Sequence, residues 1–278
     1  MKTFLLSVIC VALALSFSGC RSAAEKPVVL TLATTTSTYD SGLLDFLLPA
    51  FEEEHGINVD IISVGTGQAI EIGKRGDADI LLVHARNLED TFVEDGFGTN
   101  RWDVMYNDFV YLGPADGPVW TGMPLADALD AMIGVMSANS MNFVSRGDNS
   151  GTHNKELALW PKTGIDDPDG ESWYLSTGQG MGDALITANE MGAYVLTDRG
   201  TYLAMQNNLP NLTIVFEGDD DLFNPYGIIP VNPELHDHVK HDAAMALVAF
   251  FITPQTQEKI AVYGVEDFGQ PLFFPDAN

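Results

Sequence analysis

The sequence predicts an α/β protein of two lobes, with a ligand cleft between them. Apolar strand-like segments alternate with helix-like segments along the chain, a pattern typical of parallel strands joined by crossover helices. Hydrophobic residues make up 46% of the 278 residues, enough for the core of one large or two medium domains. Glycine- and hydroxyl-rich loops follow several expected strands, where open α/β sheets bind their ligands.

The first nineteen residues have the layout of a secretory signal. Lys2 precedes a mostly apolar run over 4–17, which is too short for a comfortable membrane span. Ser-Gly-Cys ends the run at Cys20 and resembles a bacterial lipobox, although Phe17 stands where leucine is usual. We expect a signal peptide over 1–19 and an exported protein, either lipidated at Cys20 on the outer side of the cytoplasmic membrane or free in the periplasm.

The mature chain is expected to depend on its core for stability. A short polar tether over 20–27 follows the signal. Cys10 lies inside the signal, so a chain beginning at Cys20 has no partner for an internal disulfide. No later stretch of the sequence is long and apolar enough to span a bilayer.

The charge is strongly acidic. The formal net charge is −26, and removal of 1–19 removes one lysine and no acid, so −26 − 1 gives −27. This argues against binding to nucleic acid or to anionic lipid head groups, which both need a basic face. The acidity repels an anionic ligand at long range, but salt screens that field over about 10 Å. Donors in a closed cleft can outweigh it, and we interpret the acidity as favouring solubility.

The first lobe is expected to begin with strands at 28–33, 58–64 and 78–83. A helix at 68–74 separates the last two strands, and Gly56 is a plausible stop for an earlier helix. That earlier helix has the spacing of a buried face at Leu44, Leu47, Leu48 and Phe51.

The chain is then expected to cross between the lobes twice. A strand at 108–112 leads into the turn-rich 113–124, and 225–231 is the return crossing. The second lobe is expected to contain strands at 143–144, 173–175, 193–196 and 212–216, and helices at 150–160, 183–190 and 202–207. Helices at 237–251 and 255–263 are expected to pack back on the first lobe. The predicted division is therefore 28–110 and 228–278 for the first lobe and 111–227 for the second.

Three loops share one design: each follows an expected strand, is dense in hydroxyls or glycine, and leads into a helix. They are 34–38, 63–68 and 145–152. Helix N-termini expose unpaired backbone N–H groups and the positive end of the helix dipole, so they are natural anion sites. Hydroxyls add donors, glycine allows close approach of the backbone, and Arg146 adds a permanent charge with forked donors.

A fully deprotonated tetrahedral oxyanion offers only acceptors, so its site should present only donors. Protonated phosphate would also need an acceptor, for which Asp148 is available, but Asp148 is also an ordinary turn residue. Serine and threonine before a helix are often simple N-caps, and Gly65-Thr66-Gly67 can be a simple turn. The residues that we expect to bind the oxyanion are Thr35, Thr36, Ser37, Thr66 and Gly67 from one lobe, and Arg146, Ser150, Gly151 and Thr152 from the other.

Three further patterns lack the spacing of the sites that they suggest. His236, His238 and His241 are better explained as a solvated helix start than as a metal site. The acidic 166–171 lacks the alternation of a calcium loop. The glycines over 178–182 lack the third spacing of a dinucleotide fingerprint. We expect no cofactor and no protein-bound metal cation.

Much of the mature sequence resembles the tungstate-binding proteins of bacterial tungstate ABC importers. The segments that carry the resemblance include LATTTSTYDSGLLDFLLPAF, VGTGQAIEIGKRGDADILLVHAR, FVSRGDNSGTHNKELALW and LFNPYGIIPVNPE. The resemblance implies the class II periplasmic-binding-protein fold, which binders of molybdate, sulfate and phosphate share. It also implies that 34–37 and Arg146 hold the oxyanion.

The expected function is therefore that of a monomeric, non-enzymatic substrate-binding protein. It would capture tungstate and present it to the permease of an ABC importer, closing its lobes by a hinge. Molybdate, sulfate or phosphate are alternative ligands. An alternative of another class is a secreted hydrolase that uses Ser150 and His153, although no orienting acid of known position completes a triad.

Overall fold

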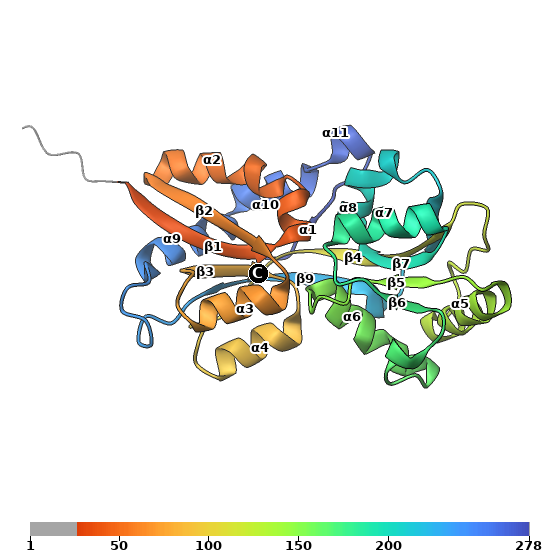
Figure 1. Cartoon of the computed structure of the whole chain (residues 1–278). Coiled ribbons are helices and arrows are strands. Elements are labelled where there is room, and N and C mark those ends of the chain that lie inside the picture. The colour runs from red at the N-terminus through yellow and green to blue at the C-terminus, as the bar shows by residue number, and fades with distance from the viewer. Residues whose placement is uncertain (1–26, 278) are drawn as a thin grey trace, which may run out of the picture.

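The structure is a computed structural model that describes residues 27–277. The expected signal peptide, Cys20 and most of the tether therefore lie outside the described residues. The described chain forms two α/β lobes that lie side by side, with strands shared between them (Figure 1). The two-lobed α/β class predicted from the sequence is confirmed.

The first lobe is built on parallel strands at one end of the sheet. β1 (Val28–Thr35) pairs in parallel with both β2 (Ile57–Val64) and β3 (Ile80–Val83). The helices that follow these strands are α1 (Thr36–Asp40), α2 (Leu43–His55), α3 (Thr66–Lys74) and α4 (Arg86–Glu94). Gly56 ends α2 with a φ of 65°, a conformation that glycine adopts without strain, so the predicted stop is confirmed.

The second lobe has a smaller sheet of its own. Its strands are β5 (Phe143–Ser145), β6 (Tyr174–Ser176), β7 (Tyr194–Asp198) and β8 (Leu212–Phe216). Its helices are α5 (Leu125–Asn139), α6 (Gly151–Leu159), α7 (Met181–Met191) and α8 (Arg199–Met205). Short 3-10 turns lie at Trp160–Thr163, Pro168–Gly170, Gln206–Asn208 and Asp220–Leu222.

Two long strands of the described chain connect the lobes. β4 (Trp102–Pro114) pairs with β9 (Phe223–Pro230) up to Asp108, and then pairs with β7 from Phe109 onward. Both pairings are antiparallel. β4 and β9 run in opposite directions because β4 enters the second lobe and β9 returns from it. The sheet is therefore mixed, in the order β2-β1-β3-β9-β4-β7-β5-β6, where periodicity alone predicted parallel strands.

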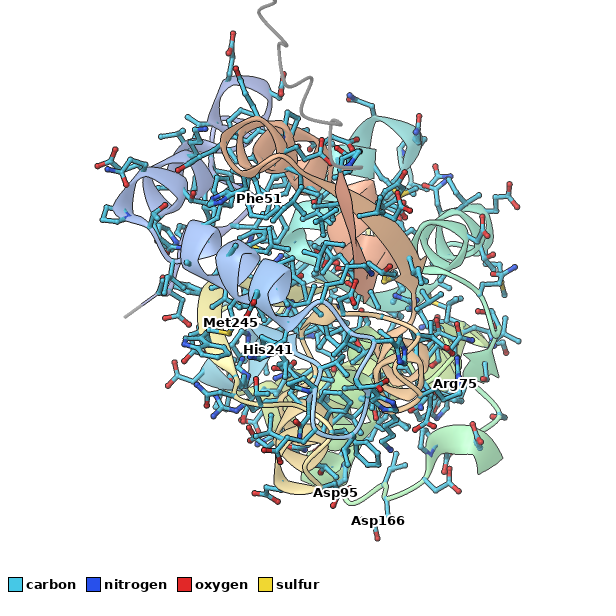
Figure 2. All side chains as sticks on the ribbon, turned by 90° about the vertical axis from the view of Figure 1, so that its left-hand side faces the viewer. Phe51, Arg75, Asp95, Asp166, His241 and Met245 are labelled. Carbon is cyan, nitrogen blue, oxygen red and sulfur yellow. The ribbon has the colours of Figure 1, made fainter. Side chains whose placement is uncertain are left out.

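The C-terminal segment returns to the first lobe, as expected. α9 (His241–Phe251) and α10 (Pro254–Val262) pack with α2 over the first strands, and α11 (Val265–Phe268) and β10 (Phe274–Pro275) follow. Leu247 and Phe251 share a buried apolar cluster with Phe51, which Figure 2 shows pointing into the lobe. A separate cluster fills the second lobe, where the rings of Phe143 and Trp160 meet edge to face at 5.0 Å.

The sequence prediction missed α4, α5 and the four-residue α11. In α5, the buried Leu125, Leu129, Met132 and Met136 have helical spacing, but the surrounding residues are almost as apolar, which weakens the contrast between faces. In α4, Phe92 and Glu89 are the buried side chains, so the apolar signal is too sparse to detect.

Acidic side chains cover the outside of the molecule. Asp95 and Asp166 are exposed and lie at the outer edge in Figure 2, and carboxylate-tipped side chains point outward around them. This distribution fits the interpretation of the acidity as a solubility feature. Within residues 27–277, none of the helices has both the length and the apolar character that a bilayer crossing needs.

Candidate functional site

The structure brings the three loops together where the lobes meet. Gly67 donates its backbone N–H to Asn149 O at 3.2 Å, and an ideal Cβ on Gly65 would lie 3.6 Å from Ser150 Cα. Arg146 Nη2 lies 3.5 Å from Thr36 Oγ1, so the third loop also contacts the first. These contacts bring the three loops that carry the nine candidate residues to one interface between the starts of α1, α3 and α6. Their role as ligand contacts remains a prediction.

Each loop opens a helix, as the sequence predicted. Thr35 caps α1, Gly65 caps α3 and Ser150 caps α6. Thr35 Oγ1 accepts from Thr38 N at 3.3 Å, and Ser150 Oγ accepts from His153 N at 3.2 Å. The N-cap interpretation therefore holds for Thr35 and Ser150. A hydroxyl that accepts from the backbone still has its own proton to donate, so capping and ligand binding are compatible.

Arg146 is deeply buried and only partly paired. Its side chain is 3% exposed, and its Nη2 forms an ion pair with Asp148 Oδ2 at 2.5 Å. Asp148 Oδ1 accepts from Ser150 N at 3.1 Å, so both carboxylate oxygens stabilise the loop. Arg146 Nε has no hydrogen-bond partner among residues 27–277. Arg146 thus braces its loop through one nitrogen and keeps another donor unused.

Among the nine candidate residues, two further buried donors share this property. Thr66 Oγ1, in the first turn of α3, and Thr152 Oγ1, in the first turn of α6, have no hydrogen-bond partner within the described part of the chain. Thr66 is 0% exposed and Thr152 is 1% exposed. A buried polar group without a partner costs about 1–3 kcal/mol, so such groups are rare without a reason. These hydrogen-bond donors come from both lobes and lack protein acceptors, so they are chemically suited to a ligand that only accepts hydrogen bonds.

A cleft lies beside these loops, and of the nine candidate residues Thr36 and Arg146 line it. It is lined by Thr36, Ser63, Val64, Gly65, Gln68, Arg146, Asp148, Gly178, Gln179 and Gly180. Gln179 donates its backbone N–H to Arg146 O at 3.1 Å, which fixes the glycine-rich segment against the third loop. Gly178 and Gly180, two of the glycines that resemble part of a dinucleotide fingerprint, are therefore part of the cleft wall.

Ser150 and His153 are not arranged as a nucleophile and its base. His153 Nδ1 accepts from Asn149 N at 3.0 Å, and Ser150 Oγ accepts from the backbone of His153. No hydrogen bond joins the hydroxyl to the imidazole in the structure of residues 27–277. The nucleophile–base contact that the hydrolase alternative requires is therefore not formed.

His84 lies among the candidate residues and was not identified by the sequence analysis. It follows β3 directly and is 5% exposed. Its Nε2 lies 3.3 Å from Ser37 Oγ, its Nδ1 lies 3.0 Å from Asn224 Oδ1, and its ring stacks on Tyr226 at 4.7 Å. An ideal Cβ on Gly151 would lie 2.7 Å from His84 Cε1, so the ring also touches the second lobe. Its position at the end of a predicted strand was a signal that could have identified it.

Two of the three histidines near the start of α9 have hydrogen-bond partners in the described residues, whereas His241 Nδ1 has none there. His236 Nε2 lies 2.9 Å from Lys74 O, and His238 Nε2 lies 2.9 Å from Gly76 O. Across the described residues, no cluster of three or more histidine, cysteine or acidic side chains is arranged to hold a metal ion.

The chain matches a known protein family and is similar to tungstate-binding proteins. Residues 21–255 match the family model of the PBP superfamily domain. The tungstate-binding protein TupA of Peptoclostridium acidaminophilum is 47% identical over 95% of this chain and 95% of its own length. The solved structure of TupA from Desulfovibrio alaskensis G20 superposes with a TM-score of 0.75 at 47% identity, covering 90% of this chain and 100% of that one. The structure of the tungstate ABC transporter protein from Geobacter sulfurreducens has a TM-score of 0.72 at 49% identity, covering 84% and 98%.

Proposed function

Because this chain belongs to the PBP superfamily, and within it to the family of tungstate-binding proteins, we propose that it captures tungstate and delivers it to an ABC importer. The observation that carries the proposal is the set of buried donors without protein acceptors at Thr66, Arg146 and Thr152. Tungstate is a tetrahedral dianion with acceptors only, so it complements buried donors that have no protein acceptor.

The two lobes would contribute different donors to the ligand. Hydroxyls and backbone N–H groups come from Thr35, Thr36, Ser37, Thr66 and Gly67 in the first lobe. The second lobe adds the guanidinium of Arg146 and the start of α6 at Ser150, Gly151 and Thr152. The helix dipoles of α3 and α6 favour negative charge at these ends. Asp148 is engaged by Arg146 and Ser150, which supports an unprotonated ligand over protonated phosphate.

Ligand release would require the lobes to separate about a hinge. We place the lobe boundaries at 111 and 227, close to where β4 changes partner after Asp108 and where β9 begins at Phe223. Two crossing strands allow bending without breaking either lobe's core. The protein would act as a monomer that carries no cofactor and performs no chemistry on its ligand, and its partner would be the membrane permease.

The function is tested by calorimetry and thermal melting with tungstate, molybdate, sulfate and phosphate. We expect tungstate to bind, with molybdate as its nearest competitor because the two ions have nearly the same size and charge. A ligand that binds only the folded protein stabilises it by about 2.7 kcal/mol at a hundredfold excess over Kd. The melting temperature should rise accordingly. The proposal fails if tungstate produces neither heat nor a melting shift while sulfate or phosphate does.

We also propose that the protein is exported and anchored by lipid at Cys20. The support is the apolar run over 4–17 and the Ser-Gly-Cys that ends it. Two acyl chains on Cys20 would hold the domain on the outer side of the cytoplasmic membrane. Intact-mass spectrometry of the protein recovered from membranes should show a first residue of Cys20 with attached lipid. A mature protein that begins at any other residue contradicts this, and Cys20→Ser should then leave its distribution unchanged.

A further inference from the structure

A chain of buried polar side chains runs from the first loop to the second lobe along the two crossing strands. Ser37 Oγ lies 3.3 Å from His84 Nε2, and His84 Nδ1 lies 3.0 Å from Asn224 Oδ1. Asn224 Nδ2 donates to Asn107 Oδ1 at 2.7 Å, and Asn107 Nδ2 donates to Asp198 Oδ1 at 3.3 Å. All five side chains are buried. The four residues beyond Ser37 in this series lie outside the three loops, and Ser37 Oγ also lies 3.2 Å from Thr35 Oγ1 within the first loop.

The carboxylate of Asp198 determines which group donates and which accepts at each hydrogen bond of this series. It accepts from Thr201 N at 2.9 Å and Thr201 Oγ1 at 2.7 Å, and an ionised carboxylate has no hydrogen to donate. Asn107 must therefore turn its amide nitrogen toward Asp198 and its oxygen toward Asn224. Asn224 must in turn donate through its nitrogen, and its second N–H points to Tyr226 OH at 3.3 Å. Its oxygen is left to accept from His84.

The same logic fixes the imidazole and the hydroxyl beyond it. His84 donates through Nδ1–H to Asn224, so a neutral ring has a bare Nε2 that can only accept. Ser37 Oγ lies 3.3 Å from Nε2 and 3.2 Å from Thr35 Oγ1. Thr35 Oγ1 can itself donate to Ser37, whereas the bare Nε2 can only accept, so the Ser37 hydroxyl is assigned as the donor to Nε2. We propose that His84 is a positioning residue of the candidate oxyanion site: its Nδ1-protonated ring accepts the hydrogen bond of the Ser37 hydroxyl, so this hydroxyl is not a donor to the ligand, whereas the unpartnered hydroxyls of Thr66 and Thr152 are.

The surroundings of His84 support a neutral ring. Burial is the main effect and lowers the pKa of His84 to about 4. Arg146 and Lys155, which face the ring from the second lobe, lower the pKa further, whereas Asp198 and the hydrogen bond to Asn224 raise it. At neutral pH the ring therefore has one proton, and Asn224 determines which nitrogen holds it.

The inference rests on the proposed function for its effect on binding, but the state of His84 can be measured without any ligand. The full chain is labelled with isotopic histidine, and the ring-nitrogen chemical shifts are recorded at neutral pH with and without tungstate. The His84 signals are assigned by their loss in His84→Gln. We expect a neutral ring protonated at Nδ1 in both samples. A ring protonated at Nε2, or at both nitrogens, overturns the proposal.

Removing one side chain from the hydrogen-bonded series tests whether Asp198 determines which nitrogen of His84 is protonated. Asn107→Ala removes the link between Asp198 and Asn224, so Asn224 is free to flip and the Nε2-protonated form of His84 should appear. Asn189→Ala is the matched control, because Asn189 is also buried and accepts from Asn211 N at 2.9 Å, away from this chain. It should leave His84 protonated at Nδ1. If Asn107→Ala also leaves it unchanged, Asp198 does not direct the chain.

Calorimetry with tungstate then compares how much each hydroxyl contributes to tungstate affinity. A hydroxyl bound to a dianion makes a hydrogen bond to a charged group, so Thr66→Val and Thr152→Val should each weaken binding about tenfold or more. Ser37→Ala removes a bond between neutral groups and should weaken binding only about threefold. A loss for Ser37→Ala equal to that of the threonine variants overturns the proposal. If the unaltered protein does not bind tungstate, the proposed function fails, while the protonation of His84 still decides whether the chain of hydrogen bonds exists.

Discussion

Replacing Arg146 with alanine should weaken tungstate binding about tenfold to a hundredfold or more. Hydrogen bonds to charged groups contribute about 1.5–3 kcal/mol, and Arg146 is the only cation in the three loops. An oxyanion with two negative charges is costly to bury among neutral partners alone. Arg146→Lys should recover part of the loss, because an ammonium supplies the charge but not the planar fork of donors. Calorimetry with each purified variant measures these differences.

The ion pair with Asp148 makes a control necessary. Arg146 also braces its loop, so its removal is expected to lower the melting temperature of the free protein. Arg101 is a matched arginine that is buried in an ion pair with Glu89 at 2.5 Å, within the first lobe. Arg101→Ala should lower the melting temperature and leave tungstate affinity unchanged. If Arg146→Ala behaves in the same way, Arg146 is only a brace and the site is misassigned.

Adding a side chain at Gly151 should prevent tight closure over the ligand. An ideal Cβ there would lie 2.7 Å from Cε1 and 2.9 Å from Nδ1 of His84, which belongs to the opposite lobe. The ring is held by Asn224 and Ser37, so it cannot move aside easily. Overpacking of this kind costs about 1–3 kcal/mol, and it acts only when the lobes are together. Gly151→Ala should therefore weaken tungstate binding about tenfold to a hundredfold, and Gly151→Val more.

The melting temperature of ligand-free protein separates this effect from misfolding. The added methyl group meets the other lobe and not the core of its own lobe, so the free protein should melt close to the unaltered one. Gly134 in α5 is the matched control, because nothing lies within 4 Å of its ideal Cβ. Gly134→Ala should retain full affinity and gain stability from its better helix propensity. Full tungstate affinity in Gly151→Val would show that closure does not bring α6 against His84.

Much of the fold followed from local signals. The strand predicted at 212–216 matches β8 (Leu212–Phe216), and the glycine predicted to end α2 does so at Gly56. The three loops were recognised because a hydroxyl or glycine before a helix is a local feature of a few residues. The resemblance that named the family also depended on contiguous segments. All of these features are encoded by neighbours in the chain.

The sequence by itself determined the α/β class, the three donor-rich loops and the tungstate-binding family. The tertiary structure decided that β4 and β9 run antiparallel between the lobes, and that His84 contacts Ser37 of the first loop. It also decided which donors already have partners: Ser37 faces His84, whereas Thr66 and Thr152 face no acceptor among the described residues. His84 and Asn224 are 140 residues apart, so their contact leaves no pattern in either local sequence. A side chain's identity shows which hydrogen bonds it can make, and only the folded chain determines which of them are already formed.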